Sequence, residues 1–287
     1  MIILKAAMII VVCCIALFLL YMFMIMPRVF GKPKKLPYFG VYYAHRGLHD
    51  NKTSAPENSM AAFRKAVEAG YGIELDVQLT KDGIPVIFHD FTLERMCGVQ
   101  GKVETFSLEE LRKLTLLQTE ERIPTLQEFL EMVKGRVPLI IELKIEWTDL
   151  SLCSVVQKML AGYRGVYCIE SFNPLALLWY RRHHKEVMRG QLSTNFKYDG
   201  NYKNIFYFFL TTSPDFIAYN CQFKEEPGRR ICRKLYKNLA VAWTVKNQKQ
   251  LDSLEKDFDL FIFDSFIPES SPVSAGQDFS GEKKFSA

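Results

Sequence analysis

The stretch GIELDVQLTKDGIPVIFHD, residues 72–90, decides the fold that we expect for this chain. Its first eight residues, 72–79, carry β-branched and apolar side chains that predict a buried strand. Alternate residues of a strand point the same way, so Glu74 and Asp76 share one face. Two carboxylates on one face of a buried strand are costly unless they are paired or bind a cation.

The second half of the same stretch predicts a hairpin. Asp-Gly is a strong turn signal, and Asp82-Gly83 separates two apolar runs, so the chain should double back antiparallel. If the turn has two residues, Lys81 pairs with Ile84, and counting along the ladder places Asp76 opposite His89. This register would bring His89 to the face that holds the acids.

Working outward, short apolar runs alternate with segments of helical period. We expect eight parallel strands at residues 41–44, 72–79, 138–143, 166–172, 188–193, 215–219, 239–245 and 260–266, with helices at 57–70, 125–135, 150–160 and 247–257 among the connections. This alternation predicts an α/β fold, a (β/α)8 TIM barrel, within the range of one domain. An open doubly wound sheet is the alternative, but no glycine-rich phosphate loop follows the first strand.

The domain boundaries follow from composition. We expect a barrel over residues 41–268, interrupted after the hairpin by an insertion at about 91–122, with the next barrel helix starting near Thr125. Residues 27–40, rich in proline, glycine and basic side chains, are expected to form a linker. The tail 269–287 has a composition typical of disorder. The aromatic run 204–212 is expected in a connection, packed against the barrel, with insertion into the membrane interface as the alternative.

The N-terminus has the composition of a membrane anchor. Residues 6–26 contain no charge, and such a helix spans the roughly 30 Å hydrocarbon layer. A cleaved signal peptide and a buried core helix are the alternatives; the run is long for a signal peptide and lacks a small-residue cleavage site. We expect a single-pass anchor at residues 1–26. Lys5 precedes the span, and Arg28, Lys32, Lys34 and Lys35 follow it, so the positive-inside rule predicts a cytoplasmic catalytic domain.

Charge and cysteine content exclude some classes of protein. The net charge of +5 is mild and forms no nucleic-acid-binding stripe, although it suits a surface near anionic lipids. The seven cysteines contain no C-x-x-C pair, so neither a disulfide scaffold nor a thiolate metal site is expected.

Polar residues gather where the predicted strands end. Glu142 and Lys144 share a face of strand 138–143 and its continuation, and the carboxyl ends of barrel strands meet at one mouth. Three converging carboxylates, Glu74, Asp76 and Glu142, favour one hard divalent cation, Mg²⁺ or Ca²⁺, over zinc. The alternative is that each acid is simply paired with Lys144 or an arginine.

The first strand ends in His45 and Arg46, beside the strand that carries the acids. Two histidines at one site, His45 and His89, can divide proton transfer between them. Arg46 has the forked geometry that binds two oxygens of a phosphate. His49, four residues on, is interpreted as a solvated loop residue.

Seven motifs in order, AHRG, ENS, ELDVQLTKDGIPVIFHD, IELK, SFNP, AWTV and FIFD, resemble the motif series of the glycerophosphodiester phosphodiesterase family. The resemblance covers residues 43–266. It implies a (β/α)8 barrel that hydrolyses glycerol-linked phosphodiesters with a divalent metal. The last strand departs from the family, whose members often carry Thr-Asp where this chain reads Phe-Asp, and this leaves the role of Asp264 open.

Carried over residue by residue, the resemblance implies metal ligands at Glu74, Asp76 and Glu142, and an acid/base pair at His45 and His89. Arg46 and Lys144 would hold the phosphate, Glu57 matches the family's Glu-Asn-Thr motif, and Trp243 would line the alcohol pocket or be a buried structural residue. We expect small glycerophosphodiesters as substrates and sn-glycerol 3-phosphate as a product. Lysophospholipids are the alternative substrate, a phospholipase C-like lyase the alternative reaction, and a membrane-tethered binding module the non-catalytic alternative; no nucleic-acid or protein partner is expected.

Overall fold

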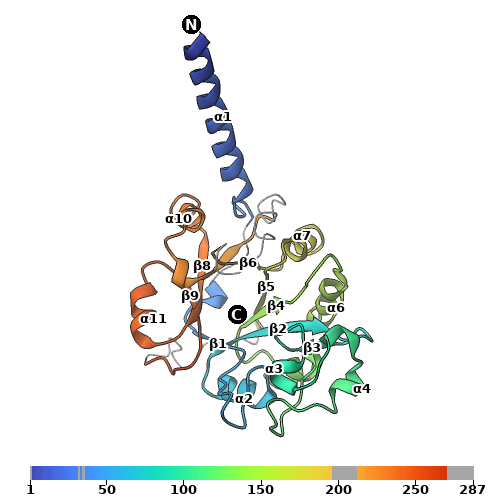
Figure 1. The fold of residues 1–287 in the computed structure, drawn as a ribbon. Coiled ribbons are helices and arrows are strands. Elements are labelled where there is room, and N and C mark those ends of the chain that lie inside the picture. The colour runs from blue at the N-terminus through green and yellow to red at the C-terminus, as the bar shows by residue number, and fades with distance from the viewer. Residues whose placement is uncertain (1, 32, 34–35, 196–211, 270–287) are drawn as a thin grey trace, which may run out of the picture.

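Eight parallel strands close into a barrel around a buried interior (Figure 1). The computed structural model describes residues 2–31, 33, 36–195 and 212–269. The strands follow the order β1-β2-β4-β5-β6-β7-β8-β9, and the barrel closes because β1 pairs in parallel with both β2 and β9. The predicted (β/α)8 barrel is confirmed, and all eight predicted strands are present.

The strands are β1 (Tyr43–His45), β2 (Gly72–Leu79), β3 (Pro85–Ile87), β4 (Leu139–Leu143), β5 (Tyr167–Ser171), β6 (Arg189–Ser193), β7 (Phe216–Asn220), β8 (Leu239–Val245) and β9 (Leu260–Phe263). The helices are α1 (Ile2–Met24), α2 (Met60–Glu68), α3 (Glu94–Cys97), α4 (Leu108–Leu111), α5 (Leu126–Val133), α6 (Ser151–Leu160), α7 (Pro174–His183), α10 (Pro227–Lys234) and α11 (Gln248–Leu254). Helix starts follow capping chemistry: Ser59 and Thr125 each accept a hydrogen bond from a backbone N–H of the first turn of α2 and α5.

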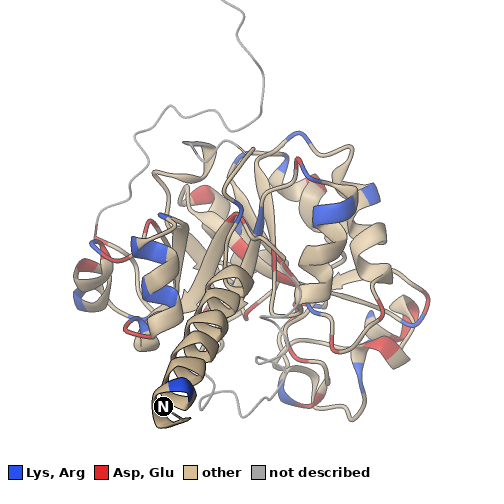
Figure 2. Cartoon of the chain, turned by 90° about the horizontal axis from the view of Figure 1, so that it is seen from above, with Lys and Arg blue, Asp and Glu red and all other residues tan. Residues whose placement is uncertain are grey.

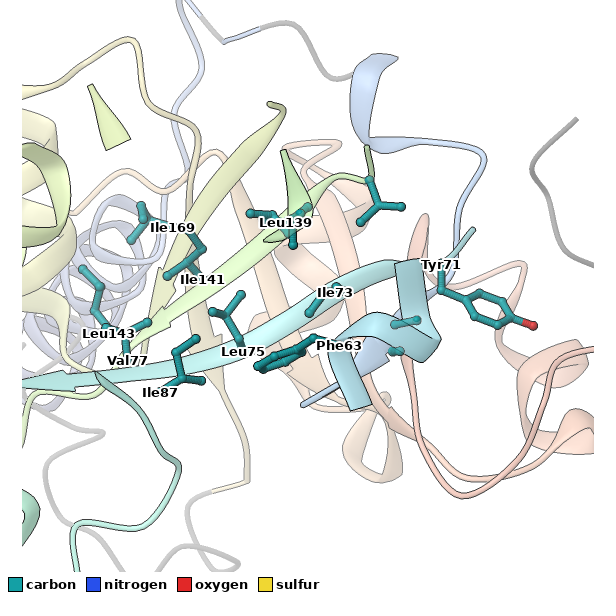
Figure 3. Packing of buried hydrophobic residues seen from close by; sticks show 14 of the residues in the cluster. Phe63, Tyr71, Ile73, Leu75, Val77, Ile87, Leu139, Ile141, Leu143 and Ile169 are labelled. Carbon is teal, nitrogen blue, oxygen red and sulfur yellow. The ribbon is translucent and has the colours of Figure 1, made fainter. Parts of the chain in front are cut away.

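The two faces of β2 have different environments. Ile73, Leu75 and Val77 point outward and pack with Phe63 of α2, and all four side chains are fully buried (Figure 3). Burying each of these aliphatic side chains contributes about 1.5–3 kcal/mol. The alternate residues, Glu74 and Asp76 among them, therefore point into the barrel. Packing of the apolar side chains on the outside fixes this orientation.

The hairpin forms, but the predicted register is wrong by one residue. The backbone N–H of Thr80 donates to the carbonyl of Ile84 at 3.0 Å, so the loop has three residues instead of two. Phe88, and not His89, lies opposite Asp76, and its N–H donates to the Asp76 carbonyl at 2.9 Å.

The cause of the shift is local. The hydroxyl of Thr80 accepts a hydrogen bond from the Ile84 N–H at 2.9 Å and bonds the Asp82 carboxylate at 2.5 Å, which closes the wider loop. Gly83 then takes a positive φ of 78°, as three-residue hairpin loops require. The hydrogen bond between the loop backbone and the Thr80 side chain therefore stabilises a three-residue loop in place of the two-residue Asp-Gly turn.

The segment after the hairpin forms a small subcluster. Between residues 91 and 122 lie α3, α4 and the 3₁₀ turn Val103–Thr105. Leu93, Met96, Val103 and Leu111 pack there against Phe88 of the hairpin, in a cluster separate from the barrel core. This packing fixes the chain that follows His89.

Inside the barrel, apolar side chains fill the end at which the strands start. Phe216 of β7 pairs with Gly190 of β6 and is 1% exposed. A Cβ on Gly190 would lie 2.0 Å from the Phe216 ring, so this ring occupies the space that any larger residue would need. The interior at this end is a packed core, and the carboxylates of β2 and β4 lie toward the opposite end.

Helix α1 leaves the side of the barrel beside α10 (Figure 1). It is long and apolar enough to cross a membrane, and its side chains are exposed from Ile2 to Leu20. Its only charged residue is Lys5, and the rest of the helix is tan in Figure 2. A signal sequence near the N-terminus passes the same test of length and hydropathy.

The end of α1 is seated on the barrel. Tyr21 Oη lies 2.8 Å from the position that a Cβ on Gly228 would take, and the Ile25 carbonyl lies 3.4 Å from Cys232 Sγ. The Arg28 N–H donates to the Pro214 carbonyl at 3.0 Å. The first residues after the helix are therefore packed on the barrel. Apart from Thr212, the aromatic run 204–212 lies outside the described residues, as does the tail beyond residue 269.

Candidate active site

Three buried carboxylates meet where the strands end. Glu74 and Asp76 come from β2 and Glu142 from β4, and the register pairs Asp76 directly with Glu142. Their ligand oxygens lie within 4.8 Å of one another, and each residue is at most 7% exposed. The sequence prediction that these acids converge is confirmed in position.

The electrostatics of this cluster favour a bound cation. Burial raises the pKa of Glu74 well above its usual value, and repulsion from Asp76, Glu170 and Glu142 raises it further. Burial also raises the pKa of Glu142. Asp76 Oδ1 is buried and has no hydrogen-bond partner among the described residues. Closely spaced carboxylates with an unpartnered oxygen are the donor set that Mg²⁺ and Ca²⁺ bind, so the residues fit such an ion.

A fourth acid belongs to the same layer and was missed by the sequence analysis. Glu170 of β5 pairs with Glu142, is 1% exposed, and leaves Oε2 without a partner among the described residues. Burial, with repulsion from Glu142 and Asp76, raises its pKa well above the usual value. Strand periodicity could have identified it. Glu170 lies two residues after Cys168 in a predicted strand, so the two side chains share the inward face, as Glu74 and Asp76 do in β2.

Lys144 lies directly after β4 and faces these acids. Its Nζ is 3.0 Å from Glu142 Oε1 and 3.6 Å from Asp76 Oδ1. Burial alone would lower the pKa of Lys144, but the two carboxylates outweigh it and raise the pKa, so the ammonium stays charged. For Asp76, burial would raise the pKa, but the charges of His89, Lys144 and Arg46 and a hydrogen bond from Asn58 lower it.

Arg46 is held at the mouth by an unusual backbone conformation and three acids. It has a positive φ of 55°, and its N–H donates to Glu74 Oε2 at 3.1 Å. Its guanidinium donates to Glu57 Oε1 at 2.6 Å and lies 3.4 Å from Asp76 Oδ2. Gly47 follows at φ 83°, where a Cβ would lie 2.9 Å from the Ala62 backbone, so only glycine lets the chain pass α2.

Glu57 has no free carboxylate oxygen. Oε1 also accepts from Arg95 at 2.7 Å, and Oε2 accepts from Asn51 at 2.7 Å and from Arg95 at 3.0 Å. Burial would raise its pKa, but these bonds and the charge of Arg46 lower it to about 2. The next residue, Asn58, donates to Asp76 Oδ2 at 2.9 Å. Arg95 of α3 was not identified from the sequence, because nothing in its own segment marks it.

His45 ends β1 and shares Asp264 with a second histidine. His45 Nδ1 lies 3.4 Å from Asp264 Oδ2, and His49 Nε2 lies 3.3 Å from Asp264 Oδ1. The interpretation of His49 as a solvated loop residue is wrong: its side chain is 11% exposed, because the turn at Gly47 folds the loop back over β9. Burial and the charge of Arg46 lower the pKa of His45 to about 4, although Asp264 opposes the shift. Lys246 also pairs with Asp264.

His89 follows the hairpin and is held by Asp90. Its Nδ1 is 2.6 Å from Asp90 Oδ1, and Asp90 is held in turn by Arg95, whose Nε donates to Oδ2 at 2.6 Å. Its side chain is 32% exposed. Although the register differs from the prediction, the charge of His89 still lowers the pKa values of Asp76 and Glu142.

Trp243 and a nearby cavity complete the mouth. Trp243 lies near the end of β8, packs edge-to-face on Phe172 at 5.6 Å, and its buried Nε1 has no hydrogen-bond partner among the described residues. A cavity of about 620 Å³ opens between the β1–α2 loop and the end of β9, lined by His49, Glu57 and Asp264 among others.

This arrangement of acids, histidines and basic residues can be compared with known proteins. The family model described as "Glycerophosphoryl diester phosphodiesterase family" matches residues 45–262. The chain belongs to this family. The match to the glycerophosphodiester phosphodiesterase family begins at His45. It includes every site residue proposed from the sequence.

Individual relatives agree with this membership. The glycerophosphodiester phosphodiesterase of Caldanaerobacter subterraneus subsp. tengcongensis is 48% identical over 109 residues, 35% of this chain. The match spans 44% of the length of that relative. Among solved structures, an Oleispira antarctica phosphodiesterase in complex with the product sn-glycerol-3-phosphate is 24% identical with a TM-score of 0.66, over 79% of this chain and 93% of that chain. A glycerophosphodiester phosphodiesterase from Thermotoga maritima is 25% identical with a TM-score of 0.62, over 78% of this chain and 94% of that chain.

Proposed function

We propose that the protein hydrolyses glycerophosphodiesters to an alcohol and sn-glycerol 3-phosphate, with a divalent cation bound by Glu74, Asp76 and Glu142. The observation that carries the proposal is that these acids, a basic pair and two histidines lie around one barrel mouth. Family membership and the named activity of the relatives support it.

The basic residues suit the binding of a phosphodiester. Arg46 and Lys144 stay charged at the edge of the acidic layer, and each has donors besides those committed to Glu57 and Glu142. In our proposal they hold the non-bridging oxygens, and Glu57 positions Arg46. A bound Mg²⁺ or Ca²⁺ would supply further positive charge against the reacting phosphate.

The two histidines divide the proton transfers. The lowered pKa of His45 keeps its ring neutral at pH 7, and Asp264 lies against Nδ1, so Nε2 remains to take a proton from the attacking hydroxyl or water. His89, fixed through Nδ1 by Asp90, gives a proton to the leaving alcohol from Nε2. Trp243 offers a buried N–H to a substrate hydroxyl at the same mouth.

Product analysis tests this proposal. Purified full-length protein should release choline from glycerophosphocholine only with Mg²⁺ or Ca²⁺, and the variants His45→Ala and His89→Ala should lose turnover while keeping ion affinity. Choline release from lysophosphatidylcholine would identify a lysophospholipase D, and a cyclic phosphate product would identify a lyase. Absence of any product with either ion, or most of kcat retained in a histidine variant, contradicts the assignment.

We also propose that α1 is retained as a single-pass anchor and that the barrel lies on the cytoplasmic side. The exposed apolar length of α1 and the excess of basic residues after it support this orientation. In this division of the chain, residues 1–26 are the anchor, 27–40 the basic linker, 41–268 the barrel and 269–287 the C-terminal tail. Intact-mass analysis of the mature protein distinguishes an anchor from a cleaved signal, and protease protection of the barrel in intact cells tests sidedness.

A further inference from the structure

A second cavity, of about 430 Å³, lies at the opposite end of the barrel from the acids. It opens between the segment that follows α1 and the first residue of β6. Four basic residues line it: Arg28, Arg181, Lys185 and Arg189. Since active sites of these barrels lie at the other end of the strands, this basic cavity is not part of the hydrolytic mouth.

Arg189 is the anomalous residue of the cavity. It is 2% exposed, and its Nη2 donates to the Ser213 carbonyl at 3.0 Å. Its Nη1 reaches Asp215 Oδ2 only at 3.6 Å, and neither Nη1 nor Nε has a hydrogen-bond partner among the described residues. A buried guanidinium with two unsatisfied nitrogens is costly, and such groups in native proteins call for a ligand or water.

Among the described residues, Arg189 shares its acidic partner with a second arginine. Asp215 is the acid in contact with it, and that carboxylate is shared: Oδ1 lies 3.4 Å from Arg28 Nη1, and Oδ2 accepts from the Arg189 backbone N–H at 3.1 Å. Burial lowers the pKa of Arg189, and the positive charges of Arg28 and Arg181 lower it further despite Asp215. Two guanidinium groups, those of Arg28 and Arg189, therefore share one carboxylate.

We propose that this cavity binds a phosphate group, through Nε and Nη1 of Arg189 with Arg28 and Lys185. A tetrahedral dianion offers several oxygens to guanidinium and ammonium donors, and it neutralises more of the excess charge than a carboxylate does. Met26, Val29 and Phe30 add apolar surface for an organic group attached to the phosphate. The phosphate belongs either to a soluble ester or to a phospholipid headgroup, because the cavity lies at the foot of α1.

The occupied site would join three parts of the chain. Arg28 lies just after α1, Lys185 just after α7, and Arg189 on β6, so one anion bridges the segment after the anchor to the barrel. The site is independent of the proposed hydrolytic function, and its test does not use turnover.

The test uses full-length protein in maltoside micelles and in phosphatidylcholine nanodiscs. Hydrogen–deuterium exchange is measured on peptides covering residues 25–30 and 185–192, which are remote from the mouth, with inorganic phosphate added to the micelles or phosphatidate added to the nanodiscs. Arg189→Gln is the direct variant. Because its burial makes folding uncertain, Lys185→Gln is the working variant, with Arg182→Gln as its control: Arg182 is an exposed cation of α7 that does not line the cavity.

We expect at least one phosphate source to slow exchange in both peptides, and Lys185→Gln to weaken the half-saturation concentration by about tenfold while Arg182→Gln leaves it within about twofold. Protection by inorganic phosphate supports the site with a soluble ester as its ligand, and protection by phosphatidate alone supports it with a lipid headgroup. No protection from either source, or equal losses in the two variants, overturns the proposal.

Discussion

Replacing Glu57 with Gln should destabilise the folded barrel at neutral pH, because Glu57 is the carboxylate that joins Arg46 to Arg95. Glu57→Gln keeps the shape and removes the charge. The folded pKa is about 2 against an ordinary value of 4.5, and one pKa unit is worth about 1.36 kcal/mol. The charge of Glu57 therefore contributes about 3 kcal/mol to stability at pH 7.

The stability contributed by the Glu57 charge should fall as the pH is lowered. Because the folded pKa lies below the unfolded value, the contribution is complete above pH 4.5 and is lost as the pH falls through about 2. The difference between wild type and Glu57→Gln should therefore shrink to about half near pH 3. The side chain at position 57 of the variant does not titrate, because the Gln amide is neutral like the protonated carboxyl.

The assay is thermal unfolding of the full-length protein in micelles, followed by intrinsic fluorescence at several pH values. For a domain of this size, 1 kcal/mol shifts Tm by roughly 2–4 °C, so the variant should melt about 6–12 °C below wild type at pH 7. Glu68→Gln, an exposed position on α2, is the matched control and should shift Tm by less than about 2 °C.

A Tm difference that stays constant between pH 7 and pH 3 would refute the reasoning, because it would show that shape and not charge stabilises the Arg46–Glu57–Arg95 network. A variant as stable as wild type at pH 7 would refute it more directly.

Further predictions concern other parts of the chain. Asp264→Asn should lower kcat by roughly 10²-fold or more without raising KM, because His45 loses the carboxylate that orients its ring; steady-state kinetics measure this split. Gly190→Ala should lower the unfolding free energy by about 1–3 kcal/mol in urea titration, because the added methyl collides with Phe216. The Cys232 thiol, whose pKa burial raises to about 12, should stay unmodified by Ellman's reagent at pH 8 until the protein is denatured. Chelation with EDTA should abolish turnover, and added Mg²⁺ or Ca²⁺ should restore it.

The parts of the site that could be predicted are those that strand periodicity controls. Glu74, Asp76 and Glu142 converge because alternation decides which side chains point inward and parallel strands end at one mouth. The same rule would have found Glu170 had it been applied to β5. The eight strands were found for the same reason.

Residues positioned by loops were not predictable in this way. The hairpin register depends on a hydrogen bond that the Thr80 hydroxyl accepts from the Ile84 N–H, which a turn dipeptide does not encode. His49 is largely covered because the chain bends back at Gly47, and Arg95 reaches Glu57 from α3 across 38 residues. These contacts depend on the paths of loops in space, for which a linear pattern carries no signal.

The seating of α1 has a consequence for how substrate arrives. Tyr21 contacts the start of α10, near the level of the mouth, Ile25 contacts its later turns, and Arg28 reaches Asp215 at the base. The Met22 carbonyl also accepts a hydrogen bond from Tyr236, which follows α10, so the last turn of α1 and the residues after it are held along the length of α10. If α1 stays in a bilayer as proposed, this seating holds the barrel at a short, fixed distance from the lipid surface, so a diester or lysolipid formed there stays close to the mouth and membrane composition becomes part of the enzyme's effective substrate concentration.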